Sequence, residues 1–221
     1  MSFKAAVIGA SGATGFQLVQ HLCKEEVCHE VHVFVRKALT IQSPKLHQHI
    51  VDFDQIASWQ NLIQGDVLFS AMGTTLKAAG SKEAQYKIDY TYQYEVAKAA
   101  AANGVKELVL VSAYGAKLKS PFFYSRMKAE LEEALIHLPF DRIHIFQPGI
   151  LDREKADGRM GEHLSLKIIY ALNKVGILRS QRPMPVHILA HRLLETQVSK
   201  NCPHSFYREP NVYYYRLADI F

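Results

Sequence analysis

The pentapeptide YSRMK, at residues 124–128, contains a tyrosine and a lysine four positions apart. On a helix this spacing places both side chains on one side, one turn apart. A nearby ammonium group favours the phenolate form of tyrosine and so lowers its pKa, which is normally about 10. Such a phenol can give a proton to a substrate oxygen, or take one from it, while a hydride moves. We therefore consider Tyr124 a candidate proton donor and Lys128 both its activating residue and a candidate cofactor contact.

Two further pairs have the same spacing, Tyr94 with Lys98 and Tyr170 with Lys174, and chance alone gives about one such pair in a chain of this composition. Context separates them. Ser112 stands at the carboxyl end of a predicted strand shortly before Tyr124, where its hydroxyl would orient and polarise a carbonyl. We interpret the other two pairs as ordinary helix-surface pairs.

The helix that carries YSRMK is predicted to begin at Ser120-Pro121, as N-cap and first helical residue, and to end before Pro139. Apolar residues then recur at helical spacing and should face a sheet: Phe123, Met127, Leu131, Leu135 and Leu138.

The glycine-rich stretch GASGATG, at residues 9–15, joins an apolar strand directly to a helix. Glycines in such a loop permit a tight turn and a close approach of the backbone to a pyrophosphate, which faces the free N–H groups of the helix. We predict a dinucleotide site with contacts from Gly9, Ser11, Gly12, Ala13, Thr14 and Gly15.

Enzymes that use NAD usually place an acidic residue about 20 positions after this loop, on the second strand, to hold the ribose hydroxyls. This chain has Arg36 and Lys37 there instead. A guanidinium can bind a 2′-phosphate with two parallel hydrogen bonds, whereas a carboxylate would repel it. The sequence therefore favours NADP(H) over NAD(H).

Three further residues are candidate cofactor contacts. Asp52 closes the predicted third strand and could accept a hydrogen bond from the adenine amino group, although a solvated strand-end carboxylate explains it equally well. Gly73 and Thr74 follow the fourth strand, where the chain could pass close to the cofactor ribose or simply turn.

Short β-rich runs alternate with longer helical patterns as far as Pro148. The predicted strands cover 3–10, 31–36, 49–54, 66–71, 107–113 and 142–148, and the longer predicted helices cover 14–25, 82–103 and 121–138. Several strands are continuous apolar runs, as in a parallel sheet covered on both faces. This alternation predicts an α/β fold with a Rossmann-type doubly wound parallel sheet.

The rhythm changes after Gly149, where we predict helices over 163–173 and 186–198 and a last strand over 212–216. This part is too short for an independent domain, so residues 1–221 are predicted to form a single domain. Residues 150–221 should fold over the carboxyl edge of the sheet as a small C-terminal excursion that partly forms the substrate side.

Composition limits the class of protein. Three cysteines are too few for a disulfide framework, no run reaches 18 apolar residues, and no signal precedes the first strand, so we expect a cytoplasmic protein that does not enter membranes. The net charge of +5 is scattered, which argues against nucleic-acid binding. His187 and His191 lack a third ligand, so no metal site is predicted.

In the order GASGATG, strand-end Ser112, YSRMK and FQPGIL, these motifs resemble the short-chain dehydrogenase/reductase superfamily. The stretches AMGTTLKAAGSKEAQYKIDY and DRIHIFQPGILDRE are similar to its atypical branch, the family of the HIV Tat-interacting protein. The resemblance covers most of residues 3–198 and implies a Rossmann fold, bound NADP(H) and a Ser112, Tyr124 and Lys128 triad. Gln147 departs from the family pattern, which often has arginine before Pro-Gly.

From these features we expect an NADP-dependent oxidoreductase that reduces a carbonyl group on a small-molecule substrate. A second hypothesis is a non-catalytic NADP(H)-binding regulator or redox sensor that acts through a protein partner, as the resemblance also implies. A third is a nucleotide-sugar epimerase or dehydratase. A homodimer or a protein partner is left open.

Overall fold

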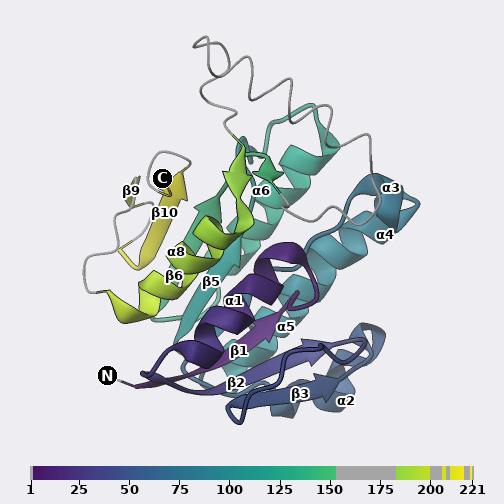
Figure 1. Ribbon diagram of the computed structural model, residues 1–221. Coiled ribbons are helices and arrows are strands. Elements are labelled where there is room, and N and C mark those ends of the chain that lie inside the picture. Colours follow the sequence, from purple (N-terminus) through teal and green to yellow (C-terminus); the bar gives the residue numbers. More distant parts are fainter. Residues whose placement is uncertain (1, 153–182, 200–205, 208–209, 217–219, 221) are drawn as a thin grey trace.

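The computed structural model describes residues 2–152, 183–199, 206–207, 210–216 and 220 (Figure 1). Strands and helices alternate through the first half of the chain. In order they are β1 (Phe3–Ile8), α1 (Ala13–Lys24), β2 (Cys28–Val35), β3 (Leu46–Ile50), α2 (Ile56–Trp59), β4 (Val67–Ser70), α3 (Leu76–Ala79), α4 (Lys82–Tyr86), η3 (Lys87–Thr91) and α5 (Tyr92–Ala102). Two short 3₁₀ turns, η1 (Phe53–Gln55) and η2 (Gln60–Leu62), flank α2.

The second half continues the alternation and then adds shorter elements. They are β5 (Glu107–Val111), α6 (Phe123–Ile136), β6 (Arg142–Gln147), β7 (Leu151–Asp152), β8 (Met184–Pro185), α8 (Val186–Val198), β9 (Phe206–Tyr207) and β10 (Val212–Arg216). Of the helices in the described part of the chain, none is both long and apolar enough to cross a bilayer.

The main sheet confirms the predicted Rossmann-type doubly wound fold. Its strand order is β3-β2-β1-β4-β5-β6-β10-β9, and every pairing is parallel except that of β10 with β9. From β1 the chain proceeds outward to β2 and β3, then returns to β4 on the other side of β1. This reversal opens a crevice above the carboxyl ends of β1 and β4, where folds of this kind bind their ligands.

Helices cover both faces of the sheet (Figure 1). On one face, α1 and α8 pack together over alternate strand residues such as Val7, Val33 and Phe69. On the other face, α5 and α6 pack over the intervening residues, among them Ile8 and Leu110. Because both faces are buried, the central strands are apolar at nearly every position.

Some predicted boundaries differ from the structure. The third strand runs over Leu46–Ile50, earlier than predicted, because it pairs with Val31–Val35 of β2. Helix α6 begins at Phe123, after an extended N-cap at Phe122. The Ser120 hydroxyl accepts a hydrogen bond from the Phe122 N–H at 3.2 Å, so this serine forms a local turn instead of the predicted helix cap.

More of the C-terminal part packs in the sheet and its helical layer than the sequence predicted. Helix α8 has the predicted bounds, but it packs against α1 on one face. Strand β10 pairs in parallel with β6 and so extends the sheet by one strand. The prediction that the tail folds over the carboxyl edge is therefore wrong for α8 and β10, because both bury apolar side chains in the core: Leu189, Leu193, Val212, Tyr214 and Tyr215. The predicted helix over 163–173 lies outside the described residues.

Candidate functional site

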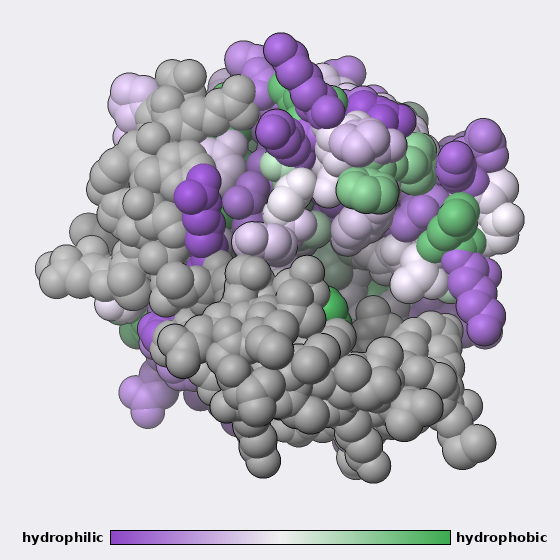
Figure 2. Space-filling model, turned by 90° about the horizontal axis from the view of Figure 1, so that it is seen from above, coloured by the Kyte–Doolittle hydropathy of each residue, from purple (hydrophilic) through white to green (hydrophobic). Residues whose placement is uncertain are grey.

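A cleft of about 890 Å³ lies at the carboxyl ends of β1, β4 and β5. This volume suits a cofactor together with a small substrate. Figure 2 looks down on this end of the molecule, where hydrophilic and hydrophobic residues both lie beside a hollow. Of the residues predicted from the sequence, the described part of the cleft wall contains Gly12, Ala13, Thr14, Gly73, Thr74, Ser112, Tyr124 and Lys128.

The glycine loop between β1 and α1 has no room for side chains at two positions. Gly9 has a φ of +80°, and a Cβ there would lie 2.4 Å from the backbone of Ala71. A Cβ on Gly15 would lie 2.3 Å from the carbonyl oxygen of Gly9. Both positions therefore require glycine, so that the loop can turn tightly and α1 can approach the strand closely.

The amino end of α1 is suited to an anion. Its N-cap is Gly12, no side chain caps it, and its first turn contains no acidic residue. The first N–H groups of a helix lack partners within the helix and carry the positive end of its dipole. Since this end lines the cleft, the residues present fit the pyrophosphate of a dinucleotide.

Ser11, Arg36, Lys37 and Asp52, the other candidate cofactor contacts, are not among the described residues that line the cleft. Arg36 and Lys37 are exposed directly after β2, and Ser11 is exposed in the glycine loop. Asp52 caps the turn η1, where its side chain accepts a hydrogen bond from the Asp54 N–H at 2.9 Å. One carboxylate oxygen of Asp52 is thus engaged locally.

Ser112 follows β5, is buried, and contacts a carboxylate that the sequence analysis did not single out. Its hydroxyl donates a short hydrogen bond to Glu132 Oε1. The Gln147 side chain donates to both oxygens of the same carboxylate, at 3.0 and 3.1 Å. Gln147, the position that departs from the family pattern, therefore fixes the Glu132 carboxylate, which in turn accepts the hydrogen bond from Ser112.

Lys128 lies beneath the cleft with only 2% of its surface exposed. Its Nζ lies 3.4 Å from the Val111 carbonyl oxygen and 3.8 Å from Oδ1 of the fully buried Asp89. Burial lowers the pKa of Lys128, whereas the charges of Asp89 and Glu132 raise it. Burial likewise raises the pKa of Asp89, and Lys128 opposes that shift.

Asp89 also positions the loop after β4. Its second oxygen accepts a hydrogen bond from the Thr74 N–H at 2.9 Å, and the Gln85 side chain donates to the Thr74 carbonyl oxygen at 3.2 Å. A Cβ on Gly73 would lie 3.2 Å from Asp89 Oδ1. Asp89 sits in the π turn η3, an irregularity that often marks functional sites. No signal in the local sequence distinguishes Asp89 from Glu83 and Glu95 on the same predicted helix.

Tyr124 lies in the first turn of α6 at the rim of the cleft, with 42% of its surface exposed. Met127, Leu131 and Leu135 are buried on this helix as predicted. Tyr124 and Lys128 therefore lie one turn apart, the tyrosine at the rim and the lysine below it.

The residues set aside in the sequence analysis have structural roles where the structure describes them. Tyr94 is half-buried on α5, where it stacks on Tyr90 with ring centroids 6.1 Å apart. The pair Tyr170 and Lys174 lies outside the described residues.

Comparison with known proteins identifies relatives over most of the chain. Residues 9–155 match a family model described as NAD(P)H-binding. The "Protein FMP52-1, mitochondrial" of Scheffersomyces stipitis is 33% identical over 201 residues, which cover 89% of this chain and 84% of that protein. The "Protein HTATIP2" of Rattus norvegicus is 33% identical over 170 residues, or 75% of this chain and 70% of that protein.

Solved structures confirm the fold. The Bordetella bronchiseptica enzyme WbmG, in complex with NAD, superposes with a TM-score of 0.69 over 98% of this chain and 73% of its own. Its sequence is only 14% identical, so the likeness concerns the fold alone.

The prediction of a cytoplasmic location is contradicted by the relatives' names. FMP52 proteins from Scheffersomyces stipitis, Eremothecium gossypii and Meyerozyma guilliermondii are all named mitochondrial. A sparse, odd cysteine count argues against an oxidising compartment without distinguishing among the others. An organelle address is a targeting segment and not a property of the folded core, so composition was a poor guide to it.

Proposed function

This chain belongs to the NAD(P)H-binding family and is an atypical short-chain dehydrogenase/reductase related to HTATIP2 and FMP52, and from that premise we propose that it is an NADP(H)-dependent oxidoreductase that reduces a carbonyl group on a small molecule. One observation carries the proposal. The glycine loop, which suits a dinucleotide, and the Ser112, Tyr124 and Lys128 side chains line the same cleft. Bound NADPH would supply the hydride, and the chain's own residues would handle the proton.

Tyr124 is the proton donor in this proposal. Its hydroxyl gives a proton to the substrate oxygen as the carbonyl carbon gains hydride, which leaves an alcohol and a tyrosinate. Because Tyr124 is partly exposed at the rim, solvent can return the proton after product leaves.

Ser112 orients the carbonyl, and Glu132 controls its hydroxyl. A serine hydroxyl has one proton, and here it points to Glu132. The serine therefore presents lone pairs to the cleft until that proton turns toward a substrate oxygen. Gln147, which donates to both oxygens of Glu132, keeps the carboxylate in place while this happens.

Lys128 supplies positive charge below Tyr124. An ammonium near a phenol favours the phenolate, so it eases loss of the tyrosine proton. Burial works against the charged lysine, and Asp89 offsets that effect. In this proposal Asp89 is a positioning residue that acts through Lys128 and through the Thr74 loop.

The rim of the cleft supports an apolar substrate. Leu76, Tyr114, Phe122 and Ile150 all line it and are 46%, 51%, 74% and 42% exposed. Exposed apolar side chains gathered around a pocket are typical of a site that binds apolar ligands. We therefore extend the proposal to small carbonyl compounds with an apolar body. Of the described residues in the predicted substrate side, 150–221, Ile150 and Leu151 line this cleft.

The cofactor preference rests on Arg36 and Lys37. They directly follow β2, where an acidic residue would favour the unphosphorylated ribose, and Arg36 can pair with a 2′-phosphate.

The test is Tyr124→Phe, which removes the transferable proton and keeps the ring. Turnover of NADPH with an apolar carbonyl panel should fall by about 10²- to 10⁴-fold, the usual contribution of a general acid, while NADPH binding and thermal stability stay unchanged. Tyr94→Phe is the matched control, because Tyr94 has the same spacing to a lysine and should leave turnover unaltered. Activity that survives Tyr124→Phe would refute the assignment. Tight NADPH binding without turnover of any carbonyl would instead favour the regulator hypothesis.

A further inference from the structure

Strands β2 and β3, at the edge of the sheet, carry four metal-binding side chains on one face. Glu30 and His32 lie two residues apart on β2, and His47 and His49 lie two residues apart on β3. His32 is directly opposite His47 in the parallel register. Successive side chains of a strand alternate between faces, so all four project from the same side of the sheet. None of them belongs to the lining of the cleft described above.

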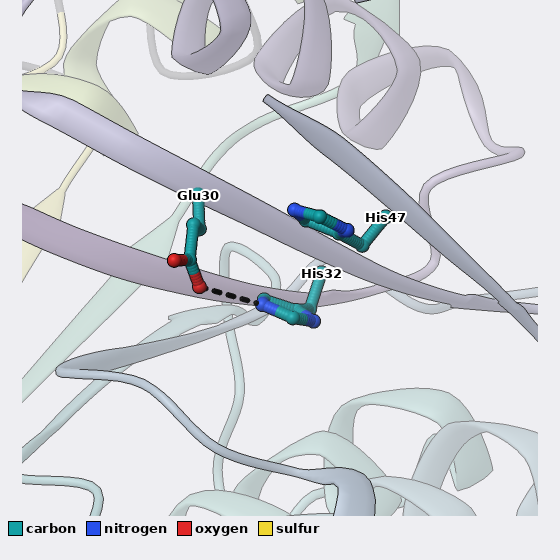
Figure 3. Close-up of side chains that lie close together, drawn as sticks. All are labelled: Glu30, His32 and His47. Carbon is teal, nitrogen blue, oxygen red and sulfur yellow. Dashed lines mark hydrogen bonds and ion pairs between the residues drawn. The ribbon is translucent and has the colours of Figure 1, made fainter. Parts of the chain in front are cut away.

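The four side chains are close enough to act together. His32 Nε2 lies 3.2 Å from Glu30 Oε2, and its ring is stacked on that of His47 with centroids 4.8 Å apart (Figure 3). One ligand atom from each of Glu30, His32 and His47 lies within 4.8 Å of the other two. Ligand atoms of a tetrahedral zinc ion are about 3.3 Å apart at zinc–nitrogen distances of about 2.0–2.1 Å. To close this difference the half-exposed Glu30 and the exposed His47 must rotate, and the His47 ring must leave its stack on His32, because imidazole lone pairs lie in the ring plane.

We propose that Glu30, His32 and His47 form a site for a divalent transition-metal ion of the zinc class, separate from the oxidoreductase cleft. Two imidazoles and one carboxylate are a donor set that zinc accepts, with water in the fourth position. The ion replaces the proton that His32 Nε2 and Glu30 share, since a ligating histidine must be free of its proton at that nitrogen.

His49 orients the central ligand. Its Nε2 lies 3.0 Å from Nδ1 of His32, so it can accept the proton of that nitrogen and leave His32 Nε2 as the ligand atom. Metal-ligating histidines usually make this kind of outer hydrogen bond, which fixes the tautomer and the ring orientation. His49 is in turn stacked on the buried Phe34, at 4.8 Å and 14°, and Phe34 is stacked on Trp59. The supporting side of the site is therefore held by the core.

A competing ion pair on Glu30 must also yield when the ion binds. Lys4 Nζ lies 3.0 Å from Glu30 Oε1, in a pair whose two side chains are 52% and 37% exposed. An exposed ion pair of this kind contributes little, so a metal ion can displace it readily. Bound metal would join β2 to the edge strand β3, and because it binds the folded state alone it would stabilise the fold.

The experiment is a calorimetric titration of chelator-treated full-length protein with Zn²⁺ alone, in a buffer that does not bind metals. We expect one site per chain, and a melting temperature that rises with zinc concentration. His47→Gln and Glu30→Gln should each weaken this site at least about tenfold, because even outer-shell substitutions weaken metal sites by about 10- to 100-fold. His29→Gln is the matched control, an exposed histidine on β2 outside the cluster.

Circular dichroism of each variant shows whether it is folded, and His47 is exposed enough for its replacement to be tolerated. Zinc affinity and melting temperature that are the same in wild type, His47→Gln and Glu30→Gln would overturn the proposal. So would an equal loss in His29→Gln, which would mean scattered binding to surface histidines.

Discussion

Replacement of Asp89 by asparagine is the sharpest test of the buried pair beneath the cleft. The carboxylate is fully buried, and its Oδ1 lies 3.8 Å from Nζ of Lys128, which is itself only 2% exposed. An asparagine has the same shape, and its amide oxygen can still accept the hydrogen bond from the Thr74 N–H. Asp89→Asn therefore removes the charge and little else.

The expected cost at pH 7 is large, because a buried ammonium is left without its counter-charge. Breaking a buried ion pair by removing one partner costs about 3–5 kcal/mol. In a chain of this size each kcal/mol lowers the melting temperature by roughly 2–4 °C, so we expect a fall of about 6–20 °C. Lys128 can limit the cost by losing its proton, which places the result toward the lower end of that range.

Because Lys128 can lose its proton, the loss of stability caused by Asp89→Asn depends on pH. Burial already lowers the pKa of Lys128 from its ordinary value of 10.5, and Asp89 raises it, so the substitution lowers this pKa further. At pH values between the pKa of Lys128 in the folded variant and its higher pKa in the unfolded chain, the unfolded chain binds more protons than the folded chain. Stability of the variant must therefore rise with pH through this window. The deficit relative to wild type should be greatest near neutral pH and should shrink as pH approaches about 10.

The assay is thermal unfolding and urea unfolding, both followed by circular dichroism, at pH 7 and at pH 9.5. Asp141→Asn is the control, because its pair with Lys106 is about two-thirds exposed on both sides and 4.0 Å long, and its melting temperature should hardly change. Adding Lys128→Met to Asp89→Asn should recover part of the lost stability, since it removes the unpaired charge. A loss no larger than that of Asp141→Asn, or one that grows with pH, would refute the account of this pair.

Two further predictions concern the cofactor site. Arg36→Ala should weaken NADPH binding by about 10- to 100-fold in calorimetry, because a charge-assisted hydrogen bond contributes about 1.5–3 kcal/mol. NADH binding should stay unchanged. Equal affinities of the wild type for the two cofactors would contradict the NADP preference. Gly15→Ala should abolish measurable NADPH binding and lower the melting temperature, because a Cβ at this position would lie 2.3 Å from the Gly9 carbonyl oxygen. Gly12→Ala should have a milder effect, because a Cβ there would lie 3.2 Å from the same oxygen. Unaltered binding in Gly15→Ala would show that the loop opens easily.

The fold class and the core of the cleft were predictable because their signals are local. A glycine loop between an apolar strand and a helix, and alternating strand and helix patterns, depend on neighbours in the sequence. Ser112 and Lys128 could be assigned to one cleft because carboxyl ends of parallel strands share an edge. The exact start of α6 was not predictable, because Ser120 can cap a helix or close a turn with the same hydroxyl.

The partners of these residues were decided only by the tertiary structure. Glu132 reaches Ser112 from 20 residues away, and Asp89 meets Lys128 from another helix of the same face. Nothing in the local pattern distinguishes these carboxylates from the solvated ones around them.

The histidine cluster shows the same division most clearly. The sequence by itself shows that Glu30 and His32, and likewise His47 and His49, are two residues apart, a spacing that puts each pair on one face once both of its residues lie in a strand. It did not determine that His32 lies opposite His47, because strand register depends on packing across the whole sheet, and a shift of one residue would turn the side chains of β3 to the other face. Local chemistry is set by neighbours along the chain, whereas a site that spans two strands exists only once the sheet has aligned them.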